Sequence, residues 1–389
     1  MFHKWVIASF VCLALSSQSW SADAERISLL YVKQQVERPP VLSNLLAVAE
    51  DEGPAGARLA IRDSNTTGRF TGQQFSLREI NFAPEASRAE IIEQLKTAKE
   101  RFVILDLPAV TLDAVLRADL DETQLMFNVA APDDRFRVEQ CRKNLLHTLP
   151  SRAMLSDALS QYLMKKRWSK WMLVEGPLQG DKRFAEAMRR SAKKFGAQIV
   201  EQKIWDGGRD ARRTAQAEVP RLTQGADYDV LIVADELGDF GEYLMYRTWA
   251  PRPVAGTQGL FPTAWYWTIE QWGAAQLQDR FVKFSGRPMD ARDYAAWAAV
   301  RSVVEGAVRT GSSVSDKISQ YIQSPEFELA AYKGRKLSYR PWSGQLRQPV
   351  ALTGARSLVT QSPQEGYLHR VSELDTLGFD RPEVHCKRN

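Results

Sequence analysis

Short apolar runs of strand length alternate with segments of helical spacing along most of the chain. In the first half, the predicted strands are residues 27–32, 75–80, 102–105 and 125–129. The helices expected between them cover residues 42–49, 87–98 and 112–116, with Ser87 as an N-cap. The polar stretch 65–68 predicts a loop that interrupts the regular structure before the strand at 75–80. This alternation of strand and helix is typical of a doubly wound parallel sheet.

A second series of the same kind begins after Pro150. Ser151 is expected to cap a helix, and Gly196 and Gly311 are expected to end later ones. The further strands are predicted at 171–174, 199–205, 228–233, 336–340 and 349–353. The further helices are predicted at 184–195, 272–284, 294–308 and 314–322. Two tandem series predict an α/β fold with two Rossmann-like lobes and parallel sheets.

The N-terminus has the features of a secretory signal peptide. Lys4 precedes an apolar run over residues 5–15, and the small-residue pattern Ala22-Asp23-Ala24 follows. The run is shorter than the roughly 20 residues needed to span a bilayer. We therefore expect export to the periplasm, with residues 1–24 removed by cleavage near Ala24.

Composition and charge narrow the function classes only slightly. The 389 residues suffice for two domains, and 52 Lys and Arg against 47 Asp and Glu give a net charge of +5. So small an excess gives no case for nucleic acid as a partner. Two cysteines remain after cleavage, Cys141 and Cys386. In an oxidising compartment they are expected to form a disulfide, the alternative being two unpaired thiols.

Sequence motifs of catalysis are missing. The chain has no phosphate-binding glycine loop, no dinucleotide fingerprint, no Gly-x-Ser-x-Gly elbow and no His-Glu-x-x-His pair. Its histidines after cleavage, His147, His369 and His385, have no partners at the spacing of a zinc motif. These absences favour a binding protein over an enzyme.

The order of elements resembles the type I periplasmic binding proteins that serve ABC transporters of the branched-chain amino acid class. The resemblance rests on two Rossmann-like lobes, a lobe change near Pro150 and a late Tyr-rich helix returning to the first lobe. It implies a multi-crossover hinge between the lobes. It also implies a first lobe of residues 25–149 plus about 273–335, and a second of 150–272 plus about 336–389.

Four segments resemble, more narrowly, a subfamily found beside pyrroloquinoline-quinone-dependent alcohol dehydrogenase systems. They are 141–151, 157–159, 166–168 and 337–349. Relatives of that subfamily are associated with lanthanide-dependent alcohol oxidation and lanthanide uptake. The resemblance therefore implies a solute connected with lanthanide use or alcohol oxidation.

The fold predicts a ligand site where the carboxyl ends of the strands border the cleft between the lobes. Polar residues follow these strand ends: Asp106, Asn128, Asp133, Asp134, Arg135, Glu175, Asp235 and Glu236. Residues 107–109 and 129–132 lack the small hydroxyl side chains with which the amino acid binders hold a carboxylate, which argues against an amino acid ligand.

Most of these residues are acids, and clustered carboxylates repel one another unless a cation compensates. A hard cation such as calcium or a lanthanide is one candidate ligand, with Asp235, Glu236 and Glu175 as its ligands. The alternatives are solvated rim residues, helix caps, or partners of Arg135 and Arg183. No cofactor is expected; a cation would be the ligand itself.

Aromatic residues favour an organic ligand or a metal chelate. Trp265 and Trp267, with Phe261 and Tyr266, lie where the chain is expected to return across the hinge. The alternative is that they pack between the lobes. Tyr294 and Trp297 have helical spacing and are expected in the core.

The leading hypothesis is therefore a periplasmic receptor that closes its lobes on a small solute and delivers it to an inner-membrane ABC permease. Candidate solutes are a metal ion, a metal chelate or a compound related to alcohol oxidation. We expect a monomer without enzymatic activity. The alternative hypothesis is an exported hydrolase that uses two cleft carboxylates. A transcriptional effector domain is disfavoured because the chain carries an export signal and no DNA-binding headpiece.

Overall fold

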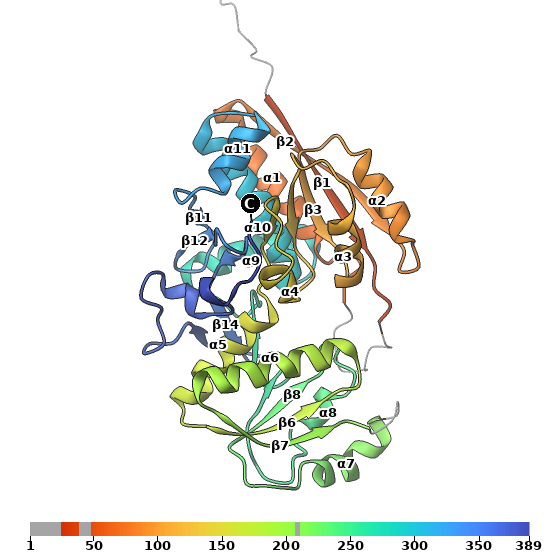
Figure 1. Cartoon of the computed structure of the whole chain (residues 1–389), viewed down its shortest axis with the longest axis vertical. Coiled ribbons are helices and arrows are strands. Elements are labelled where there is room, and N and C mark those ends of the chain that lie inside the picture. The colour runs from red at the N-terminus through yellow and green to blue at the C-terminus, as the bar shows by residue number, and fades with distance from the viewer. Residues whose placement is uncertain (1–24, 39–47, 207–210, 389) are drawn as a thin grey trace, which may run out of the picture.

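The computed structural model describes residues 25–38, 48–206 and 211–388, and it contains two α/β lobes, one above the other in Figure 1. The predicted signal peptide and most of the predicted helix 42–49 lie outside the described residues. The fold class predicted from the sequence is confirmed.

The first lobe is built on a five-stranded parallel sheet in the order β2-β1-β3-β4-β5. Its strands are β1 (Glu25–Gln34), β2 (Gln73–Phe82), β3 (Phe102–Asp106), β4 (Leu125–Asn128) and β5 (Leu145–His147). Its helices are α1 (Pro54–Thr71), α2 (Arg88–Lys96), α3 (Ala109–Arg117), α4 (Arg135–Val138), α9 (Ala274–Ser285), α10 (Ala291–Thr310) and α11 (Ser315–Ile322).

Helices cover both faces of this sheet, which explains why its strands are apolar without alternation. Leu29 and Tyr31 of β1 pack into the core formed with α1, α9, α10 and α11. Leu30 and Val32 point the other way, into the core formed with α2 and α3. Ser87 caps α2 as predicted, since its hydroxyl accepts the backbone N–H of Glu90 at 3.2 Å.

The predicted break at residues 65–68 is wrong, because α1 runs through it. The side chain of Asn65 accepts from the backbone N–H of Phe75 and donates to its carbonyl, so it fastens the helix to β2. Gly68 is required for packing: a Cβ there would lie 2.2 Å from the carbonyl oxygen of Gln73. Asn65 and Gly68, which suggested a loop, thus hold the helix against the sheet.

The second lobe is built on a four-stranded parallel sheet in the order β7-β6-β8-β9. Its strands are β6 (Lys170–Glu175), β7 (Gln198–Ile204), β8 (Val230–Ala234) and β9 (Val254–Gly256). Helices α5 (Arg152–Lys165) and α6 (Gln179–Phe195) cover one face, and α7 (Ala211–Leu222) and α8 (Gly241–Leu244) the other. Ser151 caps α5 and Gly196 ends α6 in the left-handed conformation, both as predicted.

Two small antiparallel sheets complete the C-terminal third. One contains β10 (Phe261–Thr263), β14 (Val350–Thr353) and β15 (Leu358–Ser362), and the other β11 (Leu329–Ala330), β12 (Lys336–Tyr339) and β13 (Leu346–Arg347). Short 3-10 turns occupy Gln271–Gly273, Glu373–Thr376 and Arg381–Glu383. The predicted strands at 336–340 and 349–353 correspond to β12 and β14.

The chain crosses between the two lobes three times. Leu146, Ala264 and Leu346 belong to the core of the first lobe. The second-lobe core holds Met154 after the first crossing, Ala255 before the second, and Val350 after the third. The exact lobe boundaries stay a prediction.

Side chains bind the three crossings to one another. The amide of Gln348 donates to the carbonyl of Thr148 at 2.7 Å, which joins the third crossing to the first. The ammonium of Lys333 donates to the carbonyls of Ala264 and Pro349, which joins the second crossing to the third. The crossings therefore form one hydrogen-bonded hinge.

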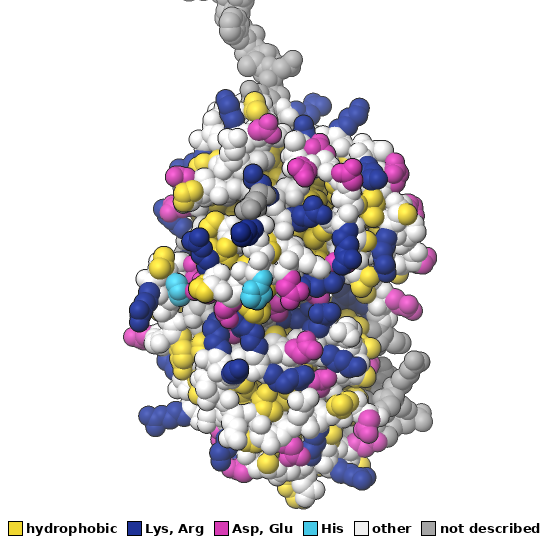
Figure 2. All heavy atoms as spheres, viewed as in Figure 1, with side chains coloured by type: hydrophobic (Ala, Val, Ile, Leu, Met, Phe, Trp, Pro, Cys, Tyr) yellow, Lys and Arg dark blue, Asp and Glu magenta, His cyan; other side chains and the backbone are white. Residues whose placement is uncertain are grey.

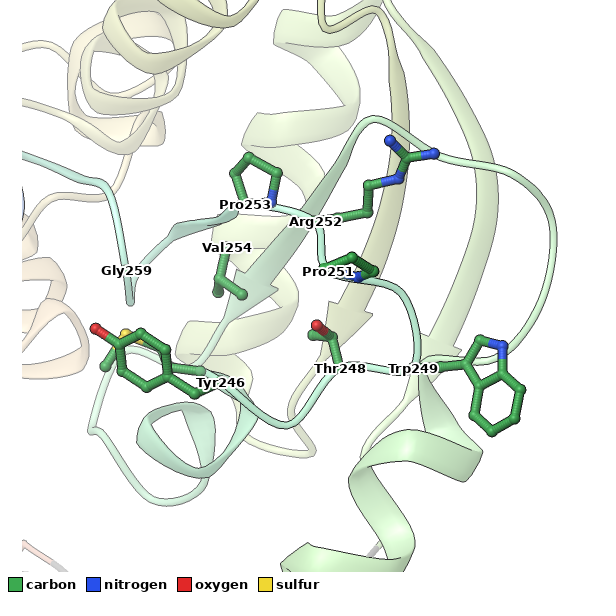
Figure 3. Close-up of a pocket in the computed structure, with 9 residues that line it drawn as sticks. Tyr246, Thr248, Trp249, Pro251, Arg252, Pro253, Val254 and Gly259 are labelled. Atoms are coloured by element: carbon green, nitrogen blue, oxygen red, sulfur yellow. The ribbon is translucent and has the colours of Figure 1, made fainter.

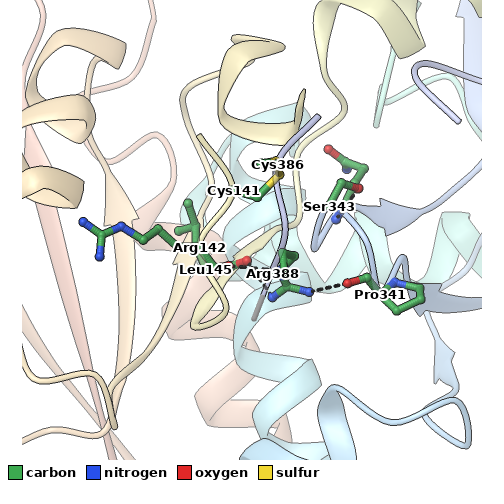
Figure 4. Close-up of a disulfide and its surroundings, with 8 residues drawn as sticks. Cys141, Arg142, Leu145, Pro341, Ser343, Cys386 and Arg388 are labelled. Atoms are coloured by element: carbon green, nitrogen blue, oxygen red, sulfur yellow. Dashed lines mark hydrogen bonds between the residues drawn. A yellow bond between two sulfur atoms is a disulfide. The ribbon is translucent and has the colours of Figure 1, made fainter. Parts of the chain in front are cut away.

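The predicted disulfide joins Cys141 to Cys386 and fastens the C-terminal tail to the first lobe (Figure 4). Beside it, Arg388 donates to the carbonyls of Lys143, Leu145 and Pro341. Within the described ranges, no helix combines the length and the apolar character needed to cross a membrane.

Candidate functional site

Each sheet has one point at which the strand order reverses. In the first lobe, β1 has β2 on one side and β3 on the other, so the reversal lies between β1 and β3. In the second, β6 lies between β7 and β8, so the reversal lies between β6 and β8. Ligands of open α/β sheets bind at this switch point, beyond the carboxyl ends of the strands. In Figure 1, β1 runs from the top of the upper lobe toward the lower lobe, so its switch point faces the second lobe.

At the switch point of the first lobe lies a groove of about 560 Å³. It is lined by the segments 34–37, 84–86 and 108–111 together with Arg88. The buried Gln34 donates to the carbonyls of Pro84 and Ala86 and accepts from the hydroxyl of Thr111 at 2.6 Å. Its amide therefore holds the three segments together, while Val36 and Val110 are exposed in the same groove.

Asp106 ends β3 at this switch point, but its carboxylate is fully buried. It accepts from the hydroxyl of Tyr31 at 2.9 Å and from Arg292 at 3.0 Å. Burial and the nearby carboxylate of Asp106 raise the pKa of Tyr31 well above its ordinary value, so the phenol stays a donor. The negative charge of Asp106 is thus compensated inside the first lobe by Arg292.

Asn128, at the end of β4, also forms its hydrogen bonds with neighbouring groups of the same lobe. Asn128 accepts from the backbone N–H groups of Ala130 and Ala131 and lies 3.0 Å from Nδ1 of His147. Burial lowers the pKa of His147 well below its ordinary value, which leaves the ring neutral. Asn128 therefore shapes the turn after β4.

Asp134 and Arg135 likewise have partners within the protein. Asp134 occupies the N-cap position of α4 without capping it, because its carboxylate accepts the backbone N–H of Ala153 at 3.2 Å. Burial raises its pKa. Arg135 donates to the carbonyl of Ala109 at 3.2 Å and lies 3.7 Å from Asp113.

Arg152 connects carboxylates of both lobes. Its guanidinium lies 2.9 Å from Asp133, after β4 of the first lobe, and donates at 2.6 and 2.7 Å to the two carboxylate oxygens of Glu236, after β8 of the second. Arg183 of α6 lies 3.6 Å from the same Asp133. Burial opposes the charge of Arg152, but Glu236 and Asp133 outweigh it and raise its pKa.

Beside this ion pair, the two lobes enclose a cavity of about 480 Å³ with charges of both signs in its wall. Its lining includes Asp133 and Arg135 from the first lobe and Arg183 and Arg190 from the second. Figure 2 shows the same mixture of basic and acidic side chains across the waist of the molecule. The interlobe surface on this side is therefore charged but balanced.

At the switch point of the second lobe, Asp181 joins the loops after β6 and β8. Its carboxylate accepts the backbone N–H of Leu178 at 3.1 Å and that of Glu236 at 2.8 Å. Burial, and then the charge of Asp235, raise the pKa of Asp181 to about 6. Leu178 and Leu237 are the exposed apolar residues of these loops.

The three predicted metal ligands have separate partners. Asp235 accepts the backbone N–H groups of Asp239, Phe240 and Gly241. Glu175 pairs with Arg189 at 2.9 Å, and Glu236 with Arg152. Among the residues that the structure describes, no group of three or more His, Cys, Asp or Glu side chains could hold a metal ion.

The predicted aromatic residues occupy different environments. Trp265 is buried in the first-lobe core, where it stacks on Tyr294 with ring centroids 4.8 Å apart and donates to Gln278. Trp267 is 45% exposed and lies beside Tyr266. Tyr294 and Trp297 are core residues, as predicted.

A separate cavity of about 550 Å³ lies on the second lobe, near the start of β9 (Figure 3). Its lining consists of Met245, Tyr246, Thr248, Trp249, Pro251, Arg252, Pro253, Val254 and Gly259. Because Val254 begins its strand, this cavity is removed from the switch point at the opposite strand ends.

Sequence reasoning did not find several residues that shape these sites. They are Val36, Val110, Arg152, Leu178, Asp181 and Leu237. Asp181 carries a usable signal, since it is the third residue of α6 and its carboxylate accepts the backbone N–H of the N-cap residue Leu178. The four apolar residues lie four or five positions beyond the ends of predicted strands, where the sequence analysis singled out polar side chains.

Residues 43–235 match a family model described as periplasmic binding protein. No curated protein matches the chain. Many solved structures share the fold.

One similar structure is a branched-chain amino acid ABC transporter periplasmic ligand-binding protein from Burkholderia xenovorans. It is 16% identical, with a TM-score of 0.68, over 86% of this chain and 95% of that one. A leucine-, isoleucine-, valine-, threonine- and alanine-binding protein from Brucella ovis, in a closed conformation, is 12% identical with a TM-score of 0.68, over 90% and 98% of the two chains. An ABC transporter solute-binding protein from R. palustris, in complex with benzoate, is 12% identical with a TM-score of 0.64, over 94% and 99%.

Proposed function

We propose that this chain is a type I periplasmic binding protein, which captures a small solute between its two lobes and delivers it unchanged to an ABC transporter. The observation that carries the proposal is the pair of switch points, one at the carboxyl edge of each sheet, on two lobes joined by three crossings. A solute between them contacts both lobes at once.

Lobe closure follows from this arrangement. A solute that binds one lobe in the open form gains further contacts only when the second lobe reaches it, so it shifts the population toward the closed form. The three crossings are bonded to one another through Gln348 and Lys333, and in this proposal they act together as the hinge of the movement.

The resemblance to the subfamily beside alcohol dehydrogenase systems supports a solute related to alcohol oxidation or to lanthanide uptake. Among these candidates, a bare cation has the weakest support, because Asp235, Glu236 and Glu175 each have their own protein partners. An organic solute or a chelate needs no such acidic cluster. We therefore favour an organic solute.

The partner would be an inner-membrane ABC permease, and the working compartment the periplasm. The similarity in fold to solute-binding components of ABC transporters supports this assignment. A monomer suffices, since both halves of the proposed site come from one chain.

The hydrolase hypothesis receives no specific support. A pair of catalytic carboxylates must be able to hold a water and exchange protons with it. At the switch points, however, Asp106 is paired with Arg292, Glu236 with Arg152, and Asp235 with three backbone N–H groups. We do not propose an enzymatic function.

A thermal-shift screen of the purified protein, followed by chemical analysis of the solute, tests the proposal. A solute that binds only the folded state stabilises it and therefore raises the melting temperature. At a free solute concentration of one hundred times Kd, the stabilisation is about 2.7 kcal/mol. We expect such a solute to be recovered unchanged after prolonged incubation. Its conversion into a product would overturn the receptor function.

A further inference from the structure

The side chain of Lys333 lies in the hinge, between two of the crossings. Its amino group donates to the carbonyl of Ala264 on the second crossing and, at 3.2 Å, to that of Pro349 on the third. Ala264 belongs to the core of the first lobe, whereas Val350, which follows Pro349, belongs to that of the second. The two bonds therefore join backbone of the first lobe to backbone at the edge of the second.

The turn that carries Lys333 has a strained backbone. Tyr332, which precedes it, has a φ of 56°, in the left-handed region that bulky residues rarely adopt. The ring of Tyr332 lies against Gly273, and the indole of Trp272, itself at a φ of 57°, lies against Gly334. A Cβ at Gly334 would come within 2.5 Å of the indole nitrogen. Strain of this kind persists only where surrounding contacts enforce it, and it is common in switch regions.

Lys333 is buried among uncharged groups. Its side chain is 2% exposed, and the two carbonyls accept its hydrogen bonds. The ring of Tyr294 lies over the amino group, with the centroid 4.7 Å from the nitrogen. Burial lowers the pKa of Lys333 from 10.5 to about 7. This arrangement of the hinge therefore favours the neutral amine.

The titratable side chains on the elements packed around Lys333 have other partners. The charged ones form ion pairs: Asp293 with Arg287, Arg335 with Glu373, and Arg347 with Asp375. The phenol of Tyr294 stays neutral, because burial raises its pKa well above its ordinary value. The hydroxyl of Tyr332 accepts from Arg280, and the ring of Tyr266 packs against aromatic neighbours. Burial therefore decides the charge state of Lys333.

We propose that Lys333 is a proton-sensitive pin of the hinge: a neutral amine keeps the lobes as described here, and protonation shifts them toward a parted form in which the second and third crossings separate. In the parted form, the carbonyl of Pro349 moves away and water reaches the amino group, which stabilises its charge. Because the parted form binds the proton more tightly, protons shift the population toward it. The proposal concerns the empty protein and does not require the receptor function.

The interlobe distance as a function of pH tests this inference. Fluorophores at Gln94→Cys of α2 and Lys193→Cys of α6, both exposed positions, report the distance by single-molecule energy transfer in the full chain. An exposed lysine has a pKa of about 10.5, against about 7 for Lys333 here. As the pH falls from about 10 to about 7, the ratio of the parted to the described form can therefore rise by up to about a thousandfold. We expect a second distance to gain population across this range and no further gain below it.

Variants assign the effect to one side chain. Lys333→Met and Lys333→Gln both remove the titratable charge, and the glutamine amide can still donate to the two carbonyls. Each is expected to show the same distribution of distances throughout the pH range. Lys336→Met, at an exposed position of β12, is the matched control and should respond to pH as the parent does.

Either of two outcomes would overturn the inference. One is a distribution of interlobe distances in the parent that does not change with pH. The other is a change that persists in Lys333→Gln or Lys333→Met. Since no solute is present in the measurement, both outcomes would leave the receptor function standing.

Discussion

The guanidinium of Arg152 lies 2.9 Å from the carboxylate of Asp133, and the two residues belong to different lobes. Arg152 starts α5 of the second lobe, whereas Asp133 follows β4 of the first. Both side chains are buried. Because the same guanidinium also pairs with Glu236, one cation bridges the strand-end loops of both sheets in this conformation.

Arg152→Met should destabilise the protein strongly. The substitution leaves the carboxylates of Asp133 and Glu236 close together without the cation between them. Removing one partner of a buried ion pair typically costs about 3–5 kcal/mol. Urea unfolding of the variant and the parent measures this difference. An unchanged free energy of unfolding would show that the pair does not contribute to the folded state.

Asp133→Asn should have a smaller effect, because Arg152 keeps Glu236 as its partner. It removes the interlobe attraction alone, so we expect the open form to gain population and the apparent affinity for any solute to fall several-fold. The melting temperature of the empty protein should change less than for Arg152→Met. Unchanged affinity would contradict a role of this pair in closure.

Lys333 should make stability depend on pH. Its ammonium is buried in the hinge over the ring of Tyr294, and burial lowers its pKa from 10.5 to about 7. Between pH 7 and about 10, the unfolded chain therefore binds a proton that the folded chain does not. The free energy of unfolding contributed by this group rises with pH across that window.

The comparison with Lys333→Met isolates this effect. Methionine has a similar length and no charge. In the variant, the free energy of unfolding should therefore no longer rise between pH 7 and about 10 through this group. Urea unfolding at several pH values gives, for each protein, the slope of the free energy of unfolding against pH. Parallel slopes would indicate that Lys333 keeps an ordinary pKa.

Asp181 should contribute a pH dependence of opposite sign. Burial raises its pKa to about 6, so between pH 4 and 6 the folded chain holds a proton that the unfolded chain has released. The contribution of this group to stability falls as the pH rises through that window. Asp181→Asn should remove the dependence, as measured by thermal melting between pH 4 and 7. A dependence that persists in the variant would assign it to another group.

The disulfide between Cys141 and Cys386 should contribute substantially to stability. It closes a loop of 245 residues, for which the chain-entropy model gives about 5 kcal/mol. Replacing both cysteines by serine should lower the melting temperature and increase hydrogen exchange around Arg388. A reducing agent should shift the parent in the same direction and leave the variant unchanged. Equal melting temperatures of parent and variant would contradict the expectation.

The strands of the sheets could be predicted because helices cover both of their faces. The runs at 27–32 and 102–105 read as buried strands for this reason, and they lie within β1 and β3. Strands of three residues such as β5 and β9 are too short to show a pattern and were missed. The polar stretch 65–68 misled because Asn65 bonds to β2 and the hydroxyl of Thr66 donates to the carbonyl of Asp63 within the helix.

The strand ends could be predicted from the sequence, but the partners of the side chains that follow them could not. Strand ends located both switch points, but the sequence does not show that Glu236 meets Arg152 or that Asp106 meets Arg292, since each pair is far apart along the chain. The acidic side chains that the sequence suggested as ligand-binding groups are therefore paired with other groups of the protein. Val36 and Leu237 are exposed beside these acids, as are the polar residues Gln35, Glu37 and Asp239.

Small-angle X-ray scattering of the protein, with and without a solute found by thermal shift, tests the central claim most directly. If the two lobes close on the solute, the radius of gyration decreases at saturation and the solute is recovered intact afterwards. An unchanged radius of gyration with the solute bound would contradict a receptor that works by lobe closure.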